Sequence, residues 1–128
     1  MIRSFITAFF LTVVHVFSPL SVQAQADYKR YYDEDNLPKV REIFGIGRFD
    51  FVLQVCDYSL QRGQPSWEWR VLRFESLANL GRYEEALAEA GKTAELFPKE
   101  LGAQLRIHEF FRATGREEEA ASTFEAIN

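Results

Sequence analysis

This 128-residue chain has one cysteine, Cys56, so it can form neither an internal disulfide nor a metal cage built from several thiolates. Its four prolines and seven glycines are too few for a collagen-like or low-complexity chain. Positive charge is also scarce, because 15 basic side chains stand against 19 acidic ones and the formal net charge is -4. We therefore expect no nucleic-acid partner, since this balance provides no basic face large enough to bind a phosphate backbone.

The rest of the composition is that of one soluble globular domain. Hydrophobic residues make up 47% of the chain and charged residues 27%, which excludes a wholly disordered chain. A length of 128 residues is typical of a single domain.

The N-terminus has the three parts of a secretory signal peptide. Arg3 is the only charged side chain in residues 1–26, an apolar stretch follows over residues 5–17, and small residues at alternate positions lead to Ala24 and Ala26. We predict that residues 1–26 are removed by cleavage after Ala26, with Ala24 as the alternative site. The mature protein is then exported, either to the periplasm or out of the cell.

A membrane anchor that stays attached is the rival interpretation of this segment. A spanning helix needs about 20 apolar residues, and the apolar stretch ends short of that length before Pro19. We therefore expect no membrane span in the mature form.

Internal repetition is the strongest feature of the remaining chain. Three glycines, each followed by arginine, recur at a spacing of 34 residues: Gly47, Gly81 and Gly115. Apolar residues recur with them, four positions before each glycine, at Ile43, Leu77 and Phe111. A period of this length predicts a repeated supersecondary unit.

Hydrophobic periodicity assigns two helices to each repeat. In the middle repeat the first helix is expected to begin after Ser66, a favourable N-cap residue. Its apolar stripe consists of Trp67, Val71, Phe74 and Leu77. Gly81 should end this helix, because glycine adopts the positive φ of a helix C-terminus without steric cost. A second stripe then runs from Tyr83 to Phe97 and closes at Pro98.

The middle repeat resembles a tetratricopeptide repeat (TPR). Gly81 and Tyr83, followed by Ala86 and Pro98, fit the pattern of that family at its spacing. The third repeat keeps the glycine and the alanine but has Glu117 in place of the tyrosine, and the first repeat is the most divergent.

The resemblance implies an all-α fold, an α-solenoid of three TPR-like antiparallel helix hairpins that form a right-handed superhelix with the last repeat incomplete. We place the TPR-like domain at residues 37–128, with repeats at about 33–66, 67–100 and 101–128. The segment before it, residues 27–36, is acidic and rich in tyrosine.

This N-terminal segment is expected to stabilise the N-terminus of the first helix, which should start near Leu37. Its acids suit a helix N-terminus, where negative charge is favourable. Its tyrosines are expected to pack on the first repeat as a cover; they are Tyr28, Tyr31 and Tyr32.

Groups suited to catalysis are few. His108 is the only histidine after residue 26, and it aligns with the inward positions Val40 and Phe74, so we expect it to be half-buried and hydrogen-bonded. Cys56 is expected to be a small buried hydrophobic residue. Both residues therefore occupy core positions, which argues against a Cys56–His108 nucleophile pair.

Carboxylates cluster at residues 84–85 and 117–119, where they open the second helices of their repeats and complement the helix dipole. The chain has neither a glycine-rich phosphate loop nor the spacing of zinc ligands. We therefore predict that it is not an enzyme and has no catalytic residues, no cofactor and no metal.

By resemblance to TPR proteins, the first helix of each repeat lines a concave wall that binds a partner. The candidate groove residues are Leu37, Arg41, Phe44, Val71, Glu75, Ala78, Asn79, Leu105, Glu109 and Arg112. A mixture of apolar and oppositely charged residues suits a short peptide or a partner helix, and an ordinary solvated face is the alternative. Apolar residues replace the lysines with which co-chaperone TPR domains hold a terminal carboxylate, so we do not expect an acidic chaperone tail.

The last helix has no following helix to cover it. We therefore expect an exposed apolar strip formed by Ala121, Phe124 and Ile127. Such a strip either pairs with another protein or indicates that the chain is the N-terminal portion of a longer exported polypeptide.

Together these features predict an exported, non-enzymatic interaction module that docks a peptide or partner helix whose identity the sequence does not give. Two alternatives stay open. One is an N-terminal accessory module of a larger exported hydrolase or peptidase, and the other is a structural unit that associates with itself through the C-terminal helix.

Overall fold

The computed structural model describes residues 27–127, with the side chains of residues 28–125. Over this range the chain forms six α-helices and two short 3-10 turns, with no strand, which confirms the all-α prediction. The 3-10 turns are η1 (Asp27–Arg30) and η2 (Glu34–Asn36), and the helices are α2 (Leu37–Gly45), α3 (Phe49–Gln61), α4 (Trp67–Asn79), α5 (Tyr83–Leu96), α6 (Leu101–Ala113) and α7 (Glu117–Ile127).

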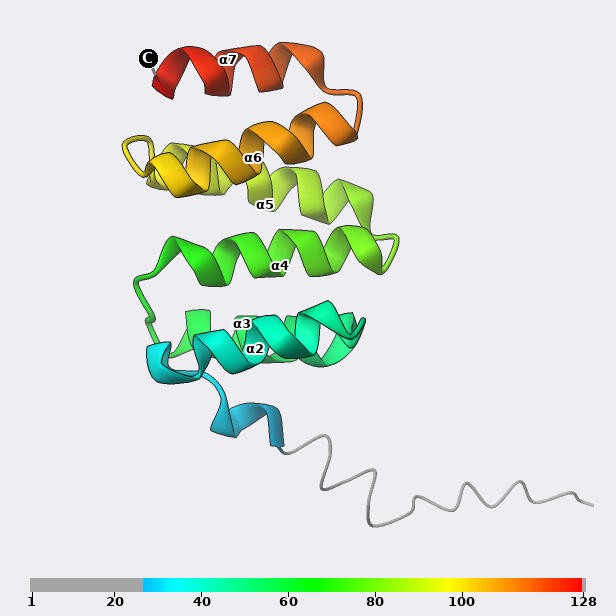
Figure 1. Cartoon of the computed structure of the whole chain (residues 1–128), viewed down its shortest axis with the longest axis vertical. Coiled ribbons are helices and arrows are strands. Elements are labelled where there is room, and N and C mark those ends of the chain that lie inside the picture. Colours follow the sequence, from blue (N-terminus) through cyan, green and yellow to red (C-terminus); the bar gives the residue numbers. More distant parts are fainter. Residues whose placement is uncertain (1–26, 128) are drawn as a thin grey trace, which may run out of the picture.

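The six helices are stacked in chain order, and each runs antiparallel to the one before it (Figure 1). Helices α2, α4 and α6 contact one another in turn, while α3 and α5 lie behind them. The three odd-numbered helices begin at Phe49, Tyr83 and Glu117, which keeps the 34-residue spacing of the sequence.

The three repeated glycines make the turns inside the helix pairs, as predicted. Gly47, Gly81 and Gly115 have φ values of 84°, 80° and 77°, a region that residues with a side chain rarely adopt. The arginine after each glycine donates its backbone N–H to the carbonyl oxygen five residues earlier, at distances between 2.8 and 3.3 Å. This bond satisfies a carbonyl at the helix end that has no partner within the helix.

The helix ends in the middle of the chain also agree with the sequence. The Oγ of Ser66 accepts a hydrogen bond from the backbone N–H of Glu68 at 3.2 Å, so Ser66 is the predicted N-cap of α4. Helix α5 ends at Leu96, with Phe97 as its C-cap next to Pro98. Proline and glycine therefore set the borders of α4 and α5 in the way their backbone preferences require.

The acidic N-terminal segment folds into the two 3-10 turns. The Oδ1 of Asp33 accepts from the backbone N–H of Asn36 at 3.2 Å and so caps η2, which continues directly into α2. Glu34 has a contact that the sequence did not indicate, because its Oε1 accepts a hydrogen bond from the indole N–H of Trp69 at 3.0 Å. This bond attaches the segment to α4.

The tyrosine cover is confirmed. Tyr31 meets Phe51 edge to face with ring centroids 5.9 Å apart, and Tyr28 and Tyr32 meet Tyr58 in the same way. Such aromatic pairs stabilise by about 0.5–1.5 kcal/mol beyond the burial of their area. They hold the segment of residues 27–36 against α3.

The core consists of two clusters, and α4 contributes to both. One contains Phe74 and Ile107, and the other contains Trp69 and Cys56; all four are fully buried. Burying a large apolar side chain contributes about 1.5–3 kcal/mol. Helix α4 therefore joins the two clusters, together with α3, whose Leu53 belongs to the first cluster.

The outer face of α7 has no covering helix in the part of the chain that the structure describes. Cys56 in α3 and its repeat equivalent Ala90 in α5 are fully buried, whereas the next equivalent, Phe124, is 51% exposed. Ala121 is exposed as well, and Ile127 ends α7 with a side chain that lies outside the described residues. Ala121 and Phe124 of the expected apolar strip are thus both exposed among the described residues.

The predicted signal peptide, residues 1–26, lies outside the described residues. Within residues 27–127, none of the helices combines the length and the apolar character needed to span a bilayer.

Candidate functional site

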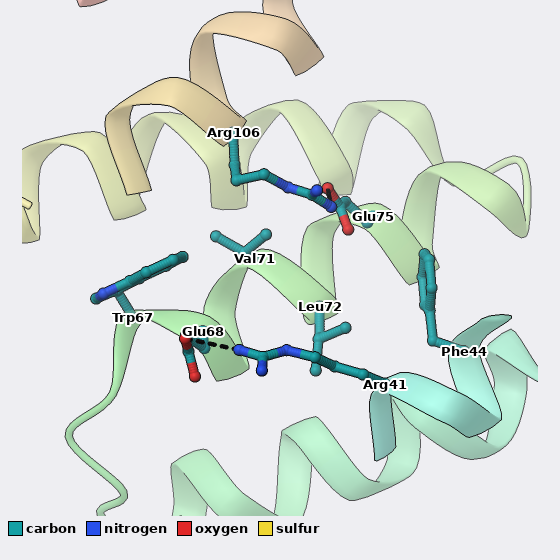
Figure 2. A pocket seen from close by; sticks show the side chains of 8 residues that line it. All are labelled: Arg41, Phe44, Trp67, Glu68, Val71, Leu72, Glu75 and Arg106. Carbon is teal, nitrogen blue, oxygen red and sulfur yellow. Dashed lines mark hydrogen bonds and ion pairs between the residues drawn. The ribbon is translucent and has the colours of Figure 1, made fainter. Parts of the chain in front are cut away.

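A pocket of about 380 Å³ opens where α2, α4 and α6 meet (Figure 2). We call this pocket the groove. It is lined by Arg41, Phe44, Trp67, Glu68, Val71, Leu72, Glu75 and Arg106. Five of the eight come from α4, and they share one helical face because they are spaced at one, three or four residues.

The floor and walls of the groove are apolar. Val71 and Leu72 form the floor and are 5% and 6% exposed. Two aromatic side chains, Phe44 from α2 and Trp67 from the start of α4, stand on opposite sides of them (Figure 2). A ligand side chain in this space loses water contact on several sides, which favours apolar groups.

The position of Trp67 depends on a glycine in α6. A Cβ atom added to Gly102 would lie 2.7 Å from Cζ2 of the Trp67 ring, closer than any side chain tolerates. Gly102 therefore makes room for the indole that forms one wall of the groove. Glycine has this role here because of close packing, since its backbone φ is not positive.

Two ion pairs cross between the helices at the rim. Arg41 of α2 binds Glu68 of α4, with Nη2 and Oε1 2.6 Å apart, and Arg106 of α6 binds Glu75 of α4. In both pairs the glutamate side chain is less exposed than the arginine side chain. The carboxylate side chains are 29% and 16% exposed, whereas both arginine side chains are 49% exposed.

Glu75 is the most unusual group of the groove. Its Oε1 accepts from Arg106, but its Oε2 is buried and has no hydrogen-bond partner in the described structure. Burial raises the pKa of this carboxyl group, Arg106 opposes that rise, and the nearby Glu109 adds to it. A buried acceptor without a donor costs about 1–3 kcal/mol relative to the same group in water.

Four of the residues predicted for a binding wall meet in the groove: Arg41, Phe44, Val71 and Glu75. The sequence did not indicate the other four, which are Trp67, Glu68, Leu72 and Arg106. The sequence places Trp67 in the core stripe of α4, and the side chain does pack against the cluster around Phe74 while it also lines the groove. For Glu68 the sequence predicts no role. A signal was nevertheless present, because Glu68 and Leu72 continue the face of α4 that carries Val71 and Glu75.

The remaining predicted residues lie outside the groove. Leu37 is 4% exposed and packs in the cluster around Trp69, so its assignment to an accessible wall is corrected. Ala78 packs against the cluster around Phe74, and Asn79 is exposed and donates from Nδ2 to the carbonyl oxygen of Glu75. The residues predicted on α6 are exposed; they are Leu105, Glu109 and Arg112.

A second set of charges, which we call the charge network, lies on the opposite side of α4. It consists of Arg70 and Arg73 from α4, Asp57 from α3 and Glu89 from α5. Glu89 is 8% exposed, and each of its oxygens has a partner, Arg70 at 3.1 Å and Arg73 at 3.0 Å. Arg73 also donates to Asp57 at 2.7 Å. Glu89, the most deeply buried carboxylate of this network, therefore has a donor at both oxygens.

The two residues considered for nucleophilic chemistry lie in separate parts of the fold. Cys56 is fully buried in the cluster around Trp69, and burial raises the pKa of its thiol, which suppresses the reactive thiolate. His108 is half-buried beside α7, with Nδ1 2.7 Å from the carbonyl oxygen of Ala120. Among the described residues, no group of three histidine, cysteine or acidic side chains is placed to hold a metal ion.

No family model, no curated protein and no solved structure matches this chain. The groove is thus characterised by its own geometry. It offers an apolar floor, two aromatic walls and charged groups of both signs, which is an arrangement suited to holding a side chain by burial and by charge-assisted hydrogen bonds.

Proposed function

We propose that this chain is a TPR-like module that binds a segment of another protein in the groove. In this proposal the three helix pairs are TPR-like hairpins in a right-handed superhelix. The support is the agreement between two periods: the glycine turns repeat every 34 residues in the sequence, and the second helices begin at the same spacing in the fold.

The observation that carries the proposal is the groove itself. It combines residues from three helices that belong to three different repeats, and its floor is nearly inaccessible to water while its rim is charged. Peptide segments bind in this way, with apolar side chains in a groove and polar groups at its edge. The proposed activity is docking, without covalent chemistry and without a cofactor.

We further propose that the module works outside the cytoplasm. The support is the N-terminal sequence, in which Arg3 precedes an apolar stretch and small residues at a cleavage site. The protein relies on packing for its stability there, since Cys56 has no second cysteine to pair with.

A peptide-display experiment tests the docking proposal. The full chain is immobilised and challenged with a library of random heptapeptides, in parallel with the variants Arg41→Glu and Lys39→Glu. Both variants reverse a charge on α2 that is paired with a glutamate, but only Arg41 lines the groove. We expect the wild type and Lys39→Glu to enrich the same peptides and Arg41→Glu to lose them. Enrichment by none of the proteins, or equal enrichment by all three, contradicts the proposal.

One observation favours a second candidate function. Phe124 is 51% exposed and Ala121 is exposed on the outer face of α7, which suits self-association or a following segment of a larger exported hydrolase or peptidase. Sedimentation of the full chain, with Phe124→Asp as the variant, separates these roles. If the wild type forms dimers and Phe124→Asp is monomeric, self-association is supported. A wild type that is monomeric at all concentrations excludes it.

A further inference from the structure

The proposed function leaves open which side chain the groove receives, and the following inference depends on that function. We propose that the groove selects a lysine side chain of the partner, with its ammonium group bound to Glu75 and its aliphatic stem on the apolar floor.

The first argument is the way in which charge is distributed around the groove. In both ion pairs at the rim the carboxylate is the better buried partner and the arginine is half-exposed. The two carboxylates belong to α4, a helix that contributes to both core clusters. The better buried charges of the groove are therefore its two negative ones, which favours a cation over an anion beside them.

The second argument is the unsatisfied oxygen of Glu75. Its Oε2 is buried and accepts no hydrogen bond in the described structure, while Arg106 binds Oε1. A donor brought by a ligand would satisfy this oxygen, and a charged donor would also offset the cost of burying the carboxylate. The electrostatic influence of Glu109 on Glu75 increases the demand for a second positive charge.

The third argument is the shape of the route to Glu75. Val71 and Leu72 form the apolar floor, and Phe44 and Trp67 stand at its sides (Figure 2). The four-carbon stem of lysine buries well on such a surface while its head stays polar. A volume of about 380 Å³ accommodates one such side chain together with part of its backbone.

The chemistry favours lysine over the other charged side chains. Aspartate or glutamate would bring a second negative charge beside Glu75. Arginine is a planar fork that suits both oxygens of a carboxylate, and Arg106 already holds one of the two. A compact ammonium needs only the oxygen that is left, so it can bind there while Arg106 keeps the other oxygen.

The role of Arg106 gives the proposal a distinctive consequence. Arg106 and the ligand share the single negative charge of Glu75, so removal of Arg106 should strengthen binding, whereas removal of the Glu75 charge should weaken it. A purely structural ion pair would behave differently, because loss of either partner would damage the groove to a similar extent.

Display libraries of heptapeptides with a fixed central residue test this inference with the full chain. Four pools carry lysine, arginine, norleucine or glutamate at the centre and random residues on both sides. We expect the lysine pool to give binders about tenfold tighter than the norleucine pool, the change expected for one charge-assisted hydrogen bond. Norleucine has the same stem without the ammonium group, so it isolates the contribution of the charge.

Two variants of the full chain are then measured with the best lysine peptides. Glu75→Gln should remove the preference for lysine over norleucine, and Arg106→Gln should increase the affinity for lysine peptides several-fold. Glu125→Gln, a change of an exposed carboxylate on α7, is the matched control and should alter neither value. Circular dichroism checks that each variant is folded, and Arg106→Gln alone still decides the matter if Glu75→Gln does not fold.

The outcomes separate the inference from the function on which it depends. Binding without a lysine preference, a preference for arginine, or weaker binding by Arg106→Gln overturns the inference and leaves the docking function in place. Failure of every pool to bind the wild type overturns both.

Discussion

Carboxylates on the two sides of α4 differ in how many of their oxygens have a hydrogen-bond partner. On the face toward α5, both oxygens of Glu89 bind arginines, at 3.1 and 3.0 Å, and the carboxylate is 8% exposed. On the groove face, Glu75 is also well buried, but one of its oxygens has no donor. In our proposal the first set of charges holds the helices together, whereas the second set also binds a ligand.

The largest expected effect is the loss of Glu89. Glu89→Ala leaves Arg70 and Arg73 partly buried without their shared partner, and breaking such a network should lower the free energy of unfolding by about 3 kcal/mol. Urea unfolding followed by circular dichroism measures this value. Glu85→Ala, which removes an exposed partner of Arg82 on the same helix, is the control and should change stability very little. Equal losses of stability in Glu89→Ala and Glu85→Ala would contradict the role given to the charge network.

The next effect concerns the packing of the groove wall. Gly102→Ala places a Cβ against the Trp67 ring, so the indole must shift, and we expect a loss of about 1–2 kcal/mol together with a changed tryptophan fluorescence spectrum. Gly91 in α5 is the matched control, because a Cβ there meets nothing within 4 Å. Gly91→Ala should stabilise the protein by about 0.5–1 kcal/mol through better helix propensity. A stabilising Gly102→Ala would show that Trp67 is not held against α6.

The smallest effect is expected at Glu75 itself. Burial raises the pKa of Glu75 in the folded protein, so the folded state binds this proton more tightly than the unfolded chain. The contribution of Glu75 to the free energy of unfolding therefore falls as the pH rises above 4.5, its ordinary pKa. Relative to Glu75→Gln, the wild type should lose stability as the pH rises above 4.5, which urea unfolding at several pH values measures. A difference that stays constant or grows with pH would contradict the account.

Much of the fold follows from local features of the sequence. The glycine spacing and the stripes of apolar residues predicted the helix pairs, because positive φ at Gly47, Gly81 and Gly115 is a property of the backbone itself. The caps at Ser66 and Asp33 are equally local, since each side chain bonds a backbone N–H two or three residues away.

The groove was predicted only in part, because it depends on how neighbouring helices are rotated about their axes. The sequence indicated Arg41 and Glu75, but it assigned them to a wall that extended toward the C-terminal half of α4, at Ala78 and Asn79. In the structure the groove lies over residues 67–75 of that helix and includes its N-terminus, where Gly102 lets Trp67 approach α6. Such close approach between residues 35 positions apart is a tertiary property, and periodicity carries no information about it.

The central claim is that the groove face of α4 binds a partner and the opposite face does not. Backbone amide chemical shifts of the full chain, recorded by NMR during titration with the best lysine-centred peptide, test this directly. We predict shifts that saturate at Phe44, Trp67 and Glu75 while Asp57 and Glu89 stay unchanged. Shifts centred on the charge network, or spread evenly over both faces, would contradict the account.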